Sequence, residues 1–169
     1  MVTERHEHSN KVPYVQKGKD AAVAYGSYDF KFRNNSGHDI KITCSRINNT
    51  TIKANEEFSF CDVVGKPTSK DGYKPADAFG KNNKIIKAIG GGNCQVSTTV
   101  YNAALGVKGL KITERHEHDR DVAYIKDGKD ATIAYDYLDL KFKNKNNFDI
   151  KLYAYVKNKK VYVKINKLA

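Results

Sequence analysis

Cys94 is the residue whose type and position most clearly suggest chemistry. It follows Gly90-Gly91-Gly92 and stands at the expected start of a helix. The backbone N–H groups in the first turn of a helix carry partial positive charge, so they lower the pKa of a thiol placed there and raise its thiolate fraction. The same groups can stabilise the oxyanion that forms when a thiolate attacks a carbonyl. The competing interpretation is a small cysteine that packs in a helix-entry turn.

A cysteine nucleophile usually works with a base, most often histidine. His116 and His118 are the candidates, and in a strand their side chains share a face with Glu114 because successive side chains alternate. Either imidazole could take the proton of Cys94 while a carboxylate orients the ring. Two other interpretations stay open: a polar strand edge that faces solvent, and a metal site in which Cys94 joins the two histidines.

An internal repeat carries these histidines. The run from Thr3 to His8 recurs from Thr113 to His118, 110 positions later, and the match continues without a gap to about Lys41 and Lys151. Roughly half of the aligned positions are identical. The segment from about Lys53 to Leu110 has no second copy. Because both copies carry His-x-His, the repeat does not say which copy completes a site around the cysteine.

The repeat suggests two units. We expect residues 1–52 to be a partial repeat of the C-terminal β half and residues 53–169 to form the main domain. Two tandem domains cut at the front would give this order, and so would a gene with a spare C-terminal half. The first copy could pack on the middle segment, form a spare sheet, or close the site of another molecule in a domain-swapped homodimer.

The patterns of apolar residues predict an α+β fold: an antiparallel β-rich domain with one principal helix that starts at the Gly-Gly-Gly-Asn-Cys motif. The repeated unit has the period-2 alternation of strands. The strands are expected at Ala131–Tyr135, Leu138–Phe142, Ile150–Val156 and Val161–Ile165, with a short one at Phe58–Phe60. Residues 66–83 are rich in loop signals. The helix is expected from Cys94 to about Leu105, where Gly106 or Gly109 can end it.

The composition limits the kinds of partner that the chain is expected to bind. The formal net charge of +11 comes from 30 basic and 19 acidic residues, and it favours anionic partners such as nucleic acid, anionic membrane or anionic cell-wall polymer. The chain has no RNA-recognition, zinc-finger or basic-region signature, so we expect no nucleic-acid partner. The three cysteines show no Cys-x-x-Cys spacing, which argues against a disulfide framework. No run reaches the length of a membrane span, and no signal peptide opens the chain.

The residues around Cys94 resemble the VanW domain family over about Thr51 to Ile165. The motifs that carry the resemblance are Phe58-Ser59-Phe60, Val63-Val64-Gly65, Gly72-Tyr73-Lys74, the run Gly90 to Thr99, Tyr101-Asn102-Ala103-Ala104, Glu114 to His118, Asp130-Ala131 and Leu138 to Asn144. The chain departs from the family pattern at Cys61, where Asn or a similar residue is common, and at Asp119, where Ser is common.

The resemblance implies an activity. Some clostridial members of the family are understood to be L,D-transpeptidases that form 3-3 peptidoglycan cross-links with the cysteine of this motif. It therefore implies that Cys94 is the nucleophile and that His116 or His118 serves as base and then acid. From their charge alone, Arg115 or Lys74 could hold a substrate carboxylate. The resemblance also implies that the stem peptide is bound near Gly91, Gly92, Asn93, Gln95, Ser97 and Tyr73.

The implied partners are peptidoglycan stem peptides and anionic cell-wall polymers, with no cofactor. The expected location is extracytoplasmic, at the cell wall, in a piece excised from a larger exported or membrane-anchored protein. A non-catalytic basic wall-binding module is the alternative from another class, because the net charge alone supports it. A third alternative is a metal-dependent hydrolase that uses Cys94, His116 and His118.

Overall fold

We describe the protein from a computed structural model, in which residues 20–25, 36–79, 85–119, 125, 128–158 and 160–168 are placed. The motif from Thr3 to His8 lies outside the described residues, and so do the masked parts of the first repeat copy. None of the helices in the described ranges is long and apolar enough to cross a membrane.

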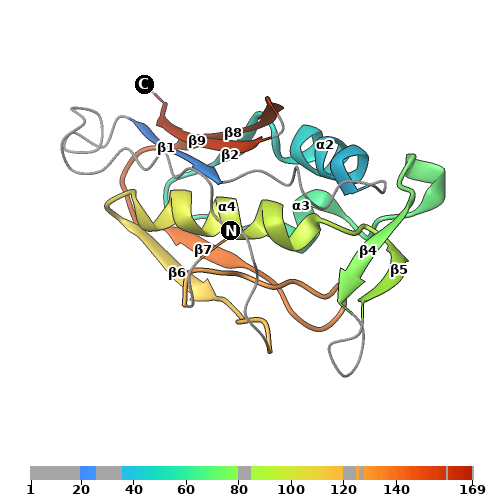
Figure 1. Ribbon diagram of the computed structural model, residues 1–169. Helices are drawn as coiled ribbons and strands as arrows, with labels where there is room; N and C mark the ends of the chain where they lie inside the picture. The colour runs from blue at the N-terminus through green and yellow to red at the C-terminus, as the bar shows by residue number, and fades with distance from the viewer. Residues whose placement is uncertain are drawn as a thin grey trace.

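A four-stranded antiparallel sheet with the order β1-β9-β8-β2 forms one side of the fold (Figure 1). Its strands are β1 (Asp20–Tyr25), β9 (Lys160–Lys167), β8 (Ile150–Lys157) and β2 (Thr50–Ile52). The expected strands at Ile150–Val156 and Val161–Ile165 are confirmed as β8 and β9, which alternate between buried apolar and outward polar positions.

A three-stranded sheet with the order β3-β7-β6 lies on the opposite side of the helix α4 (Figure 1). Its strands are β3 (Glu57–Ser59), β7 (Lys141–Asn144) and β6 (Leu110–Glu114). Phe58 of β3 stacks on Phe142 of β7 with their ring centroids 4.8 Å apart, and both rings are buried. The expected short strand at Phe58–Phe60 is therefore confirmed, although Phe60 already begins the short helix α3 (Phe60–Val64).

Helix α4 (Asn93–Leu105) lies between the two sheets and begins and ends close to the expected limits, with Gly106 as its C-cap. It is buried on nearly every side, because apolar side chains pack into the core while small polar ones bond to neighbouring backbone. An α+β fold rich in antiparallel strands is confirmed.

Two elements differ from the sequence-based expectations. Residues from Ser36 to Ile47 form the helix α2, where the repeat predicted a strand matching β8. The reason lies in Ile40, Cys44 and Ile47, which recur at helical spacing and are all buried beside β8 and α4. The segment 66–83, expected to be loop, contains the short turn η1 (Ser69–Asp71) and the strand β4 (Pro75–Phe79), which pairs with β5 (Ile85–Ile89).

The expected strand at Ala131–Tyr135 is reduced to isolated bridges at Thr132 and Ala134. The equivalent residues of the first repeat copy form the regular strand β1, which pairs with β9. The two copies therefore adopt different structures. The division into units at residues 52 and 53 stays a prediction, and α2 contributes side chains to the same core as α4.

Candidate active site at the start of helix α4

The backbone path before α4 requires the three glycines from Gly90 to Gly92. Gly90 and Gly92 have φ angles of +85° and +99°, a region that L side chains rarely adopt. Gly91 is buried, and a Cβ atom there would lie 2.6 Å from the carbonyl oxygen of Asp77 in β4. The glycine run thus lets the chain turn tightly against β4 and places Cys94 in the first turn of α4.

The backbone N–H groups of Asn93, Cys94 and Gln95 in the first turn of α4 differ in their backbone acceptors among the described residues. Asn93 donates its N–H to the carbonyl of Gly90 at 3.2 Å, and Gln95 donates to that of Gly92 at 3.0 Å. In the described part of the chain the N–H of Cys94 has no such backbone acceptor. A first-turn N–H without a backbone acceptor can donate to an anion at the helix start.

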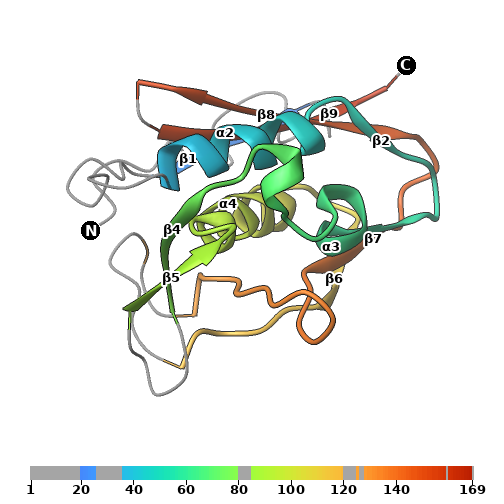
Figure 2. The same cartoon turned by 90° about the vertical axis from the view of Figure 1, so that its right-hand side faces the viewer.

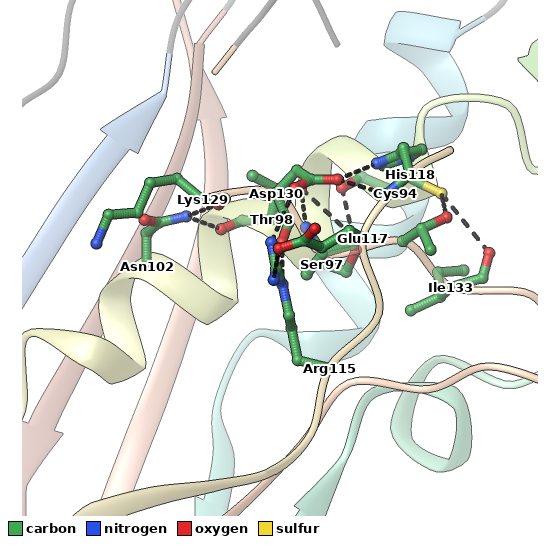
Figure 3. Close-up of polar contacts among 12 residues, drawn as sticks. Cys94, Ser97, Thr98, Asn102, Arg115, Glu117, His118, Lys129, Asp130 and Ile133 are labelled. Carbon is green, nitrogen blue, oxygen red and sulfur yellow. Dashed lines mark hydrogen bonds and ion pairs between the residues drawn. The ribbon is translucent and has the colours of Figure 1, made fainter. Parts of the chain in front are cut away.

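His118 and Asp130 complete the surroundings of the thiol (Figure 3). Asp130 accepts hydrogen bonds through Oδ2 from the backbone N–H of His118 at 2.7 Å and from its ring nitrogen Nδ1 at 2.6 Å. Both side chains are buried, with exposed fractions of 5% and 8%. Because Nδ1 is bonded to Asp130, the interaction of the ring with Cys94 falls to Nε2. The three groups therefore follow one another in the order Cys94 thiol, His118 imidazole, Asp130 carboxylate.

The charges in this cluster support one another. Burial alone raises the pKa of the Cys94 thiol, but the hydrogen bond and the charge of His118 outweigh burial, and the net pKa is lowered from 9.0. Burial alone lowers the pKa of His118, but Cys94 and then Asp130 outweigh it, and the net pKa is raised from 6.5. Each group therefore favours the charged form of the other, a thiolate beside an imidazolium.

The other two cysteine thiols, in contrast to Cys94, have a raised pKa. Burial raises the pKa of the Cys44 thiol to about 12. The pKa of Cys61 is also raised, by burial and by the neighbouring carboxylate of Asp139. All three cysteines are free thiols. Only the cysteine at the start of α4 has surroundings that stabilise a thiolate.

Helix α4 also positions Asp130, through side chains on the turns after Cys94. Ser97 donates to the carbonyl of Ala131 at 2.5 Å, and Thr98 accepts the N–H of Ala131 at 3.0 Å. Asn102 donates to the carbonyl of Lys129 at 2.6 Å. The helix that carries the thiol thus holds the backbone on both sides of the carboxylate. These bonds also explain why this segment is not a regular strand.

The thiol contacts the same segment. Its sulfur lies 3.6 Å from the hydroxyl of Thr132 and 3.6 Å from the carbonyl oxygen of Ile133. Thr132 in turn donates its N–H to the carbonyl of His116 at 2.9 Å, which links this segment to the one that bears the histidines. Residues from three parts of the chain therefore meet at one sulfur atom.

Arg115 lies behind the carboxylate rather than beside the thiol. Its guanidinium donates to the backbone carbonyl of Asp130 at 2.7 Å and to Oδ1 of Asp130 at 2.9 Å. It also pairs with Glu117 and lies 5.3 Å from the ring centroid of Tyr101 on α4. Its side chain is 16% exposed. Arg115 thus holds Asp130 in place, and its expected role in holding a substrate carboxylate stays a prediction from its charge.

The structure separates the two candidate histidines. His116 bonds to Oε1 of Glu114 at 3.0 Å, and Lys141 bonds to Oε2 of the same carboxylate at 2.9 Å. His116 is 37% exposed, whereas the histidine that lowers the pKa of Cys94 is His118. The strand β6 ends at Glu114, so the simple alternation that placed both rings on one face with Glu114 does not continue to His118.

Two residues named from the resemblance, Asn93 and Tyr73, belong to a buried polar network. Thr43 of α2 donates to Oδ1 of Asn93 at 2.6 Å and lies 3.0 Å from the hydroxyl of Tyr73. Asn93 donates through Nδ2 to the hydroxyl of Tyr135 at 3.2 Å. This network ties α2 to the first turn of α4. It thereby holds the residue that directly precedes Cys94.

The remaining predicted residues divide between surface and interior. Lys74 is exposed, and its backbone N–H bonds to the buried carboxylate of Asp39 at 2.9 Å. Gln95 is buried directly after the thiol. Among the described residues no group of three or more His, Cys, Asp or Glu side chains is arranged to hold a metal ion.

Asp130 is the site residue that the sequence reasoning missed. In the sequence it belongs to Asp130-Ala131, a motif that carries the family resemblance, and its counterpart Asp20 stands in the same Gly-Lys-Asp-Ala context of the first copy. A signal was present: a histidine base needs a carboxylate to orient it, and Asp130 lies in the segment that repeats together with the histidines.

The fold and the site define an α+β protein with a thiol–imidazole–carboxylate cluster at the start of its central helix. The chain belongs to the VanW-like protein family, whose model matches residues 1–45 and 35–166. It is 37% identical over 130 residues to the uncharacterized protein YoaR of Bacillus subtilis, covering 77% of this chain and 42% of YoaR.

A second relative is the vancomycin B-type resistance protein VanW of Enterococcus faecalis. It is 27% identical over 158 residues, which cover 89% of this chain and 56% of that protein. The chain thus spans about half the length of these two relatives. No solved structure matches the chain.

Proposed function

We propose that this protein is a cysteine-dependent L,D-transpeptidase that forms 3-3 peptidoglycan cross-links through a thioester. The observation that carries the proposal is the bonding of His118 to Asp130 at 2.6 Å next to a thiol whose pKa is lowered. A positioned base with a buried carboxylate behind it is the arrangement that activates a nucleophile for acyl transfer.

In the first half-reaction the Cys94 thiolate attacks the carbonyl carbon of the third residue of a tetrapeptide stem. A C–S bond forms, and the carbonyl oxygen becomes an oxyanion that the N–H of Cys94 can stabilise. When the oxyanion collapses, the C–N bond to the terminal D-alanine breaks. The protonated His118 gives its Nε2 proton to the departing amine, and D-alanine leaves.

In the second half-reaction the side-chain amine of a neighbouring stem attacks the thioester. His118 takes a proton from this amine, the C–S bond breaks, and the thiolate beside an imidazolium is restored. Asp130 stabilises the imidazolium in both half-reactions. If water replaces the amine, the product is a shortened stem, so access of the amine decides between cross-linking and carboxypeptidation.

Family membership and the name of the enterococcal relative support a role connected with the cell wall. A net charge of +11 suits a protein that works among anionic wall polymers. An extracytoplasmic location is part of the proposal, because the proposed substrate lies outside the membrane.

The test is the intact mass of the protein after incubation with purified tetrapeptide muropeptides, for the wild type, Cys94→Ala and Cys61→Ala. We expect an acyl adduct or a cross-linked dimer with the wild type and with Cys61→Ala, and neither with Cys94→Ala. Cys61→Ala is the matched control because it removes a free thiol whose pKa is raised. Absence of adduct and of product in the folded wild type would reject the transpeptidase in favour of a non-catalytic wall-binding module.

A further inference from the structure

A chain of hydrogen bonds runs from α2 through the first turn of α4 to Tyr135. Thr43 donates its proton to Oδ1 of Asn93 at 2.6 Å, because an amide oxygen can only accept. Thr43 also lies 3.0 Å from the carbonyl oxygen of Asp39, but the shorter contact takes the proton. The hydroxyl of Tyr73, 3.0 Å from that of Thr43, is then the donor in their contact. Asn93 in turn donates through Nδ2 to the Tyr135 hydroxyl at 3.2 Å, so every donor points toward Tyr135.

The Tyr135 hydroxyl ends this chain with its own proton unused. A phenol can accept and donate at the same time, and its bond from Asn93 uses only the accepting role. Within the described part of the chain, Asn93 is the only hydrogen-bond partner of this hydroxyl. Hydrogen bonds in a row polarise one another, so the preceding bonds make the last O–H a stronger donor. Its proton is therefore available to an acceptor that enters the site.

Contacts of both the side chain and the backbone place Tyr135 near the thiol. Its partner Asn93 directly precedes Cys94 in the first turn of α4. The carbonyl oxygen of Ile133, two residues before Tyr135, lies 3.6 Å from the sulfur. In both views α2 lies on one side of α4 and the segment that leads into β7 lies on the other (Figures 1 and 2). The chain of bonds therefore crosses the start of α4 and ends beside Cys94.

The surroundings keep the phenol of Tyr135 protonated. Burial raises its pKa, the hydrogen bond from Asn93 opposes this rise, and the charges of the neighbouring Cys61 and Cys94 add to it. The pKa of Tyr135 is thus raised from 10.0, whereas that of Cys94 is lowered from 9.0. The phenol therefore remains an O–H donor when the thiol is ionised. Its ring is partly buried against the core, so the donor is held in place before any reaction begins.

We propose that Tyr135 is a catalytic residue whose hydroxyl donates a hydrogen bond to the oxyanion of the substrate, with the N–H of Cys94 as the second donor. As the C–S bond forms, the electron pair of the C=O bond moves onto oxygen and the bond from Tyr135 strengthens. As the oxyanion collapses, the leaving group departs and this bond weakens, and the phenol keeps its proton throughout. The assignment rests on the acyl transfer of the proposed function, but it holds for any carbonyl that the thiolate attacks.

The test compares two reactions of Cys94 in the full chain, both measured by peptide mass spectrometry. Acylation by p-nitrophenyl acetate passes through an oxyanion, whereas alkylation by iodoacetamide does not. We expect Tyr135→Phe to slow acylation at least about tenfold and to leave the rate and the pH midpoint of alkylation unchanged. The unchanged midpoint also shows that the variant has folded around the thiol. Tyr137→Phe is the matched control, because it removes the hydroxyl of a tyrosine that is 85% exposed, and it should change neither rate.

Thr43→Val tests the chain of bonds from its position on α2. The substitution removes the proton donated to Asn93 and nearly keeps the shape of the side chain. The ratio of acylation to alkylation should fall by less than in Tyr135→Phe, because the hydroxyl of Tyr135 remains but loses the bonds that orient and polarise it.

An unchanged ratio in Tyr135→Phe would overturn the proposal. Equal slowing of both reactions would overturn it as well, since Tyr135 would then act on the thiolate and not on the oxyanion. The ratio needs no stem peptide, so the two proposals can fail separately. A lower ratio in Tyr135→Phe without any reaction of the wild type with tetrapeptide stems would contradict only the proposed function. Transfer of stem peptides at the wild-type rate by Tyr135→Phe would contradict only the role of Tyr135.

Discussion

Two histidines that stand two positions apart in the chain lie in contrasting surroundings. His118 is buried, bonded to Asp130 and next to Cys94, whereas His116 is partly exposed and belongs to the cluster of Glu114 and Lys141. Both have a carboxylate at hydrogen-bond distance. The difference is that only the buried pair has a thiol beside it, that of Cys94.

This contrast teaches that a histidine–carboxylate pair is not by itself a catalytic pair. In the exposed cluster Glu114 bonds to Lys141, to His116 and to the N–H of Asp139, so it joins β6 to the segment that leads into β7. In the buried cluster α4 supplies the thiol and also holds the backbone around Asp130. The former arrangement connects strands, and the latter holds an imidazole next to a thiol.

The largest expected effect comes from replacing His118, and His116 is replaced separately for comparison. His118→Asn should lower the rate of thioester formation roughly 10²- to 10⁴-fold, because the base and acid of the reaction is removed. His116→Asn should leave it within about threefold of the wild type. Rapid-quench mass spectrometry of the acyl-enzyme measures both rates. Equal losses in the two variants would break the comparison.

Asp130→Asn tests the carboxylate behind His118. Loss of the carboxylate lowers the pKa of His118, so the imidazolium is less populated. The pKa of Cys94 rises in turn, because the thiolate loses the neighbouring positive charge. The midpoint of the pH profile for alkylation by iodoacetamide should therefore move upward by about one pH unit, with acyl transfer slowed at least about tenfold. A midpoint that stays in place would mean that Asp130 does not act on the thiol through His118.

Arg115→Lys tests how firmly Asp130 must be held. Lysine keeps the charge but cannot bond to both the backbone carbonyl and Oδ1 of Asp130 in the geometry of a guanidinium. We expect a three- to tenfold slower acyl transfer, and an alkylation midpoint between those of the wild type and Asp130→Asn. Glu117→Gln is the control, since Glu117 pairs with Arg115 but is 62% exposed. A change in melting temperature with an unchanged midpoint would limit Arg115 to a structural role.

Glu114→Gln should produce the smallest effect on catalysis and a visible effect on acid stability. Lys141 lowers the pKa of Glu114 from 4.5 to about 2. Hydrogen bonds from His116 and the N–H of Asp139 contribute to this shift, whereas partial burial opposes it. Its contribution to stability is thus present above pH 4.5 and lost as the pH falls toward 2. The substitution should cost roughly 1–3 kcal/mol near neutral pH and flatten the loss between pH 4.5 and 2, measured by urea unfolding. An unchanged pH dependence would show that other carboxylates govern acid unfolding.

Much of the fold follows from short-range patterns. The helix after the glycine run and the strands β8 and β9 were predictable because their apolar residues recur with one clear period. The helix α2 was not, since Ile40 and Cys44 also fit the alternation of the repeat copy they resemble. Its helical form depends on β8 and α4, which bury those side chains in the complete structure.

The sequence by itself determined that Cys94 begins a helix, that the glycines precede it and that one of two histidines could serve it, because these features depend on local backbone preferences. Only the tertiary structure decided that the histidine beside Cys94 is His118, that the carboxylate bonded to this ring is Asp130 and that Arg115 holds this carboxylate. These three assignments depend on segments that meet across the core. The end of β6 at Glu114 and the hydrogen bonds from α4 to residues 129–131 bring them together, and neither is encoded in any single stretch of the chain.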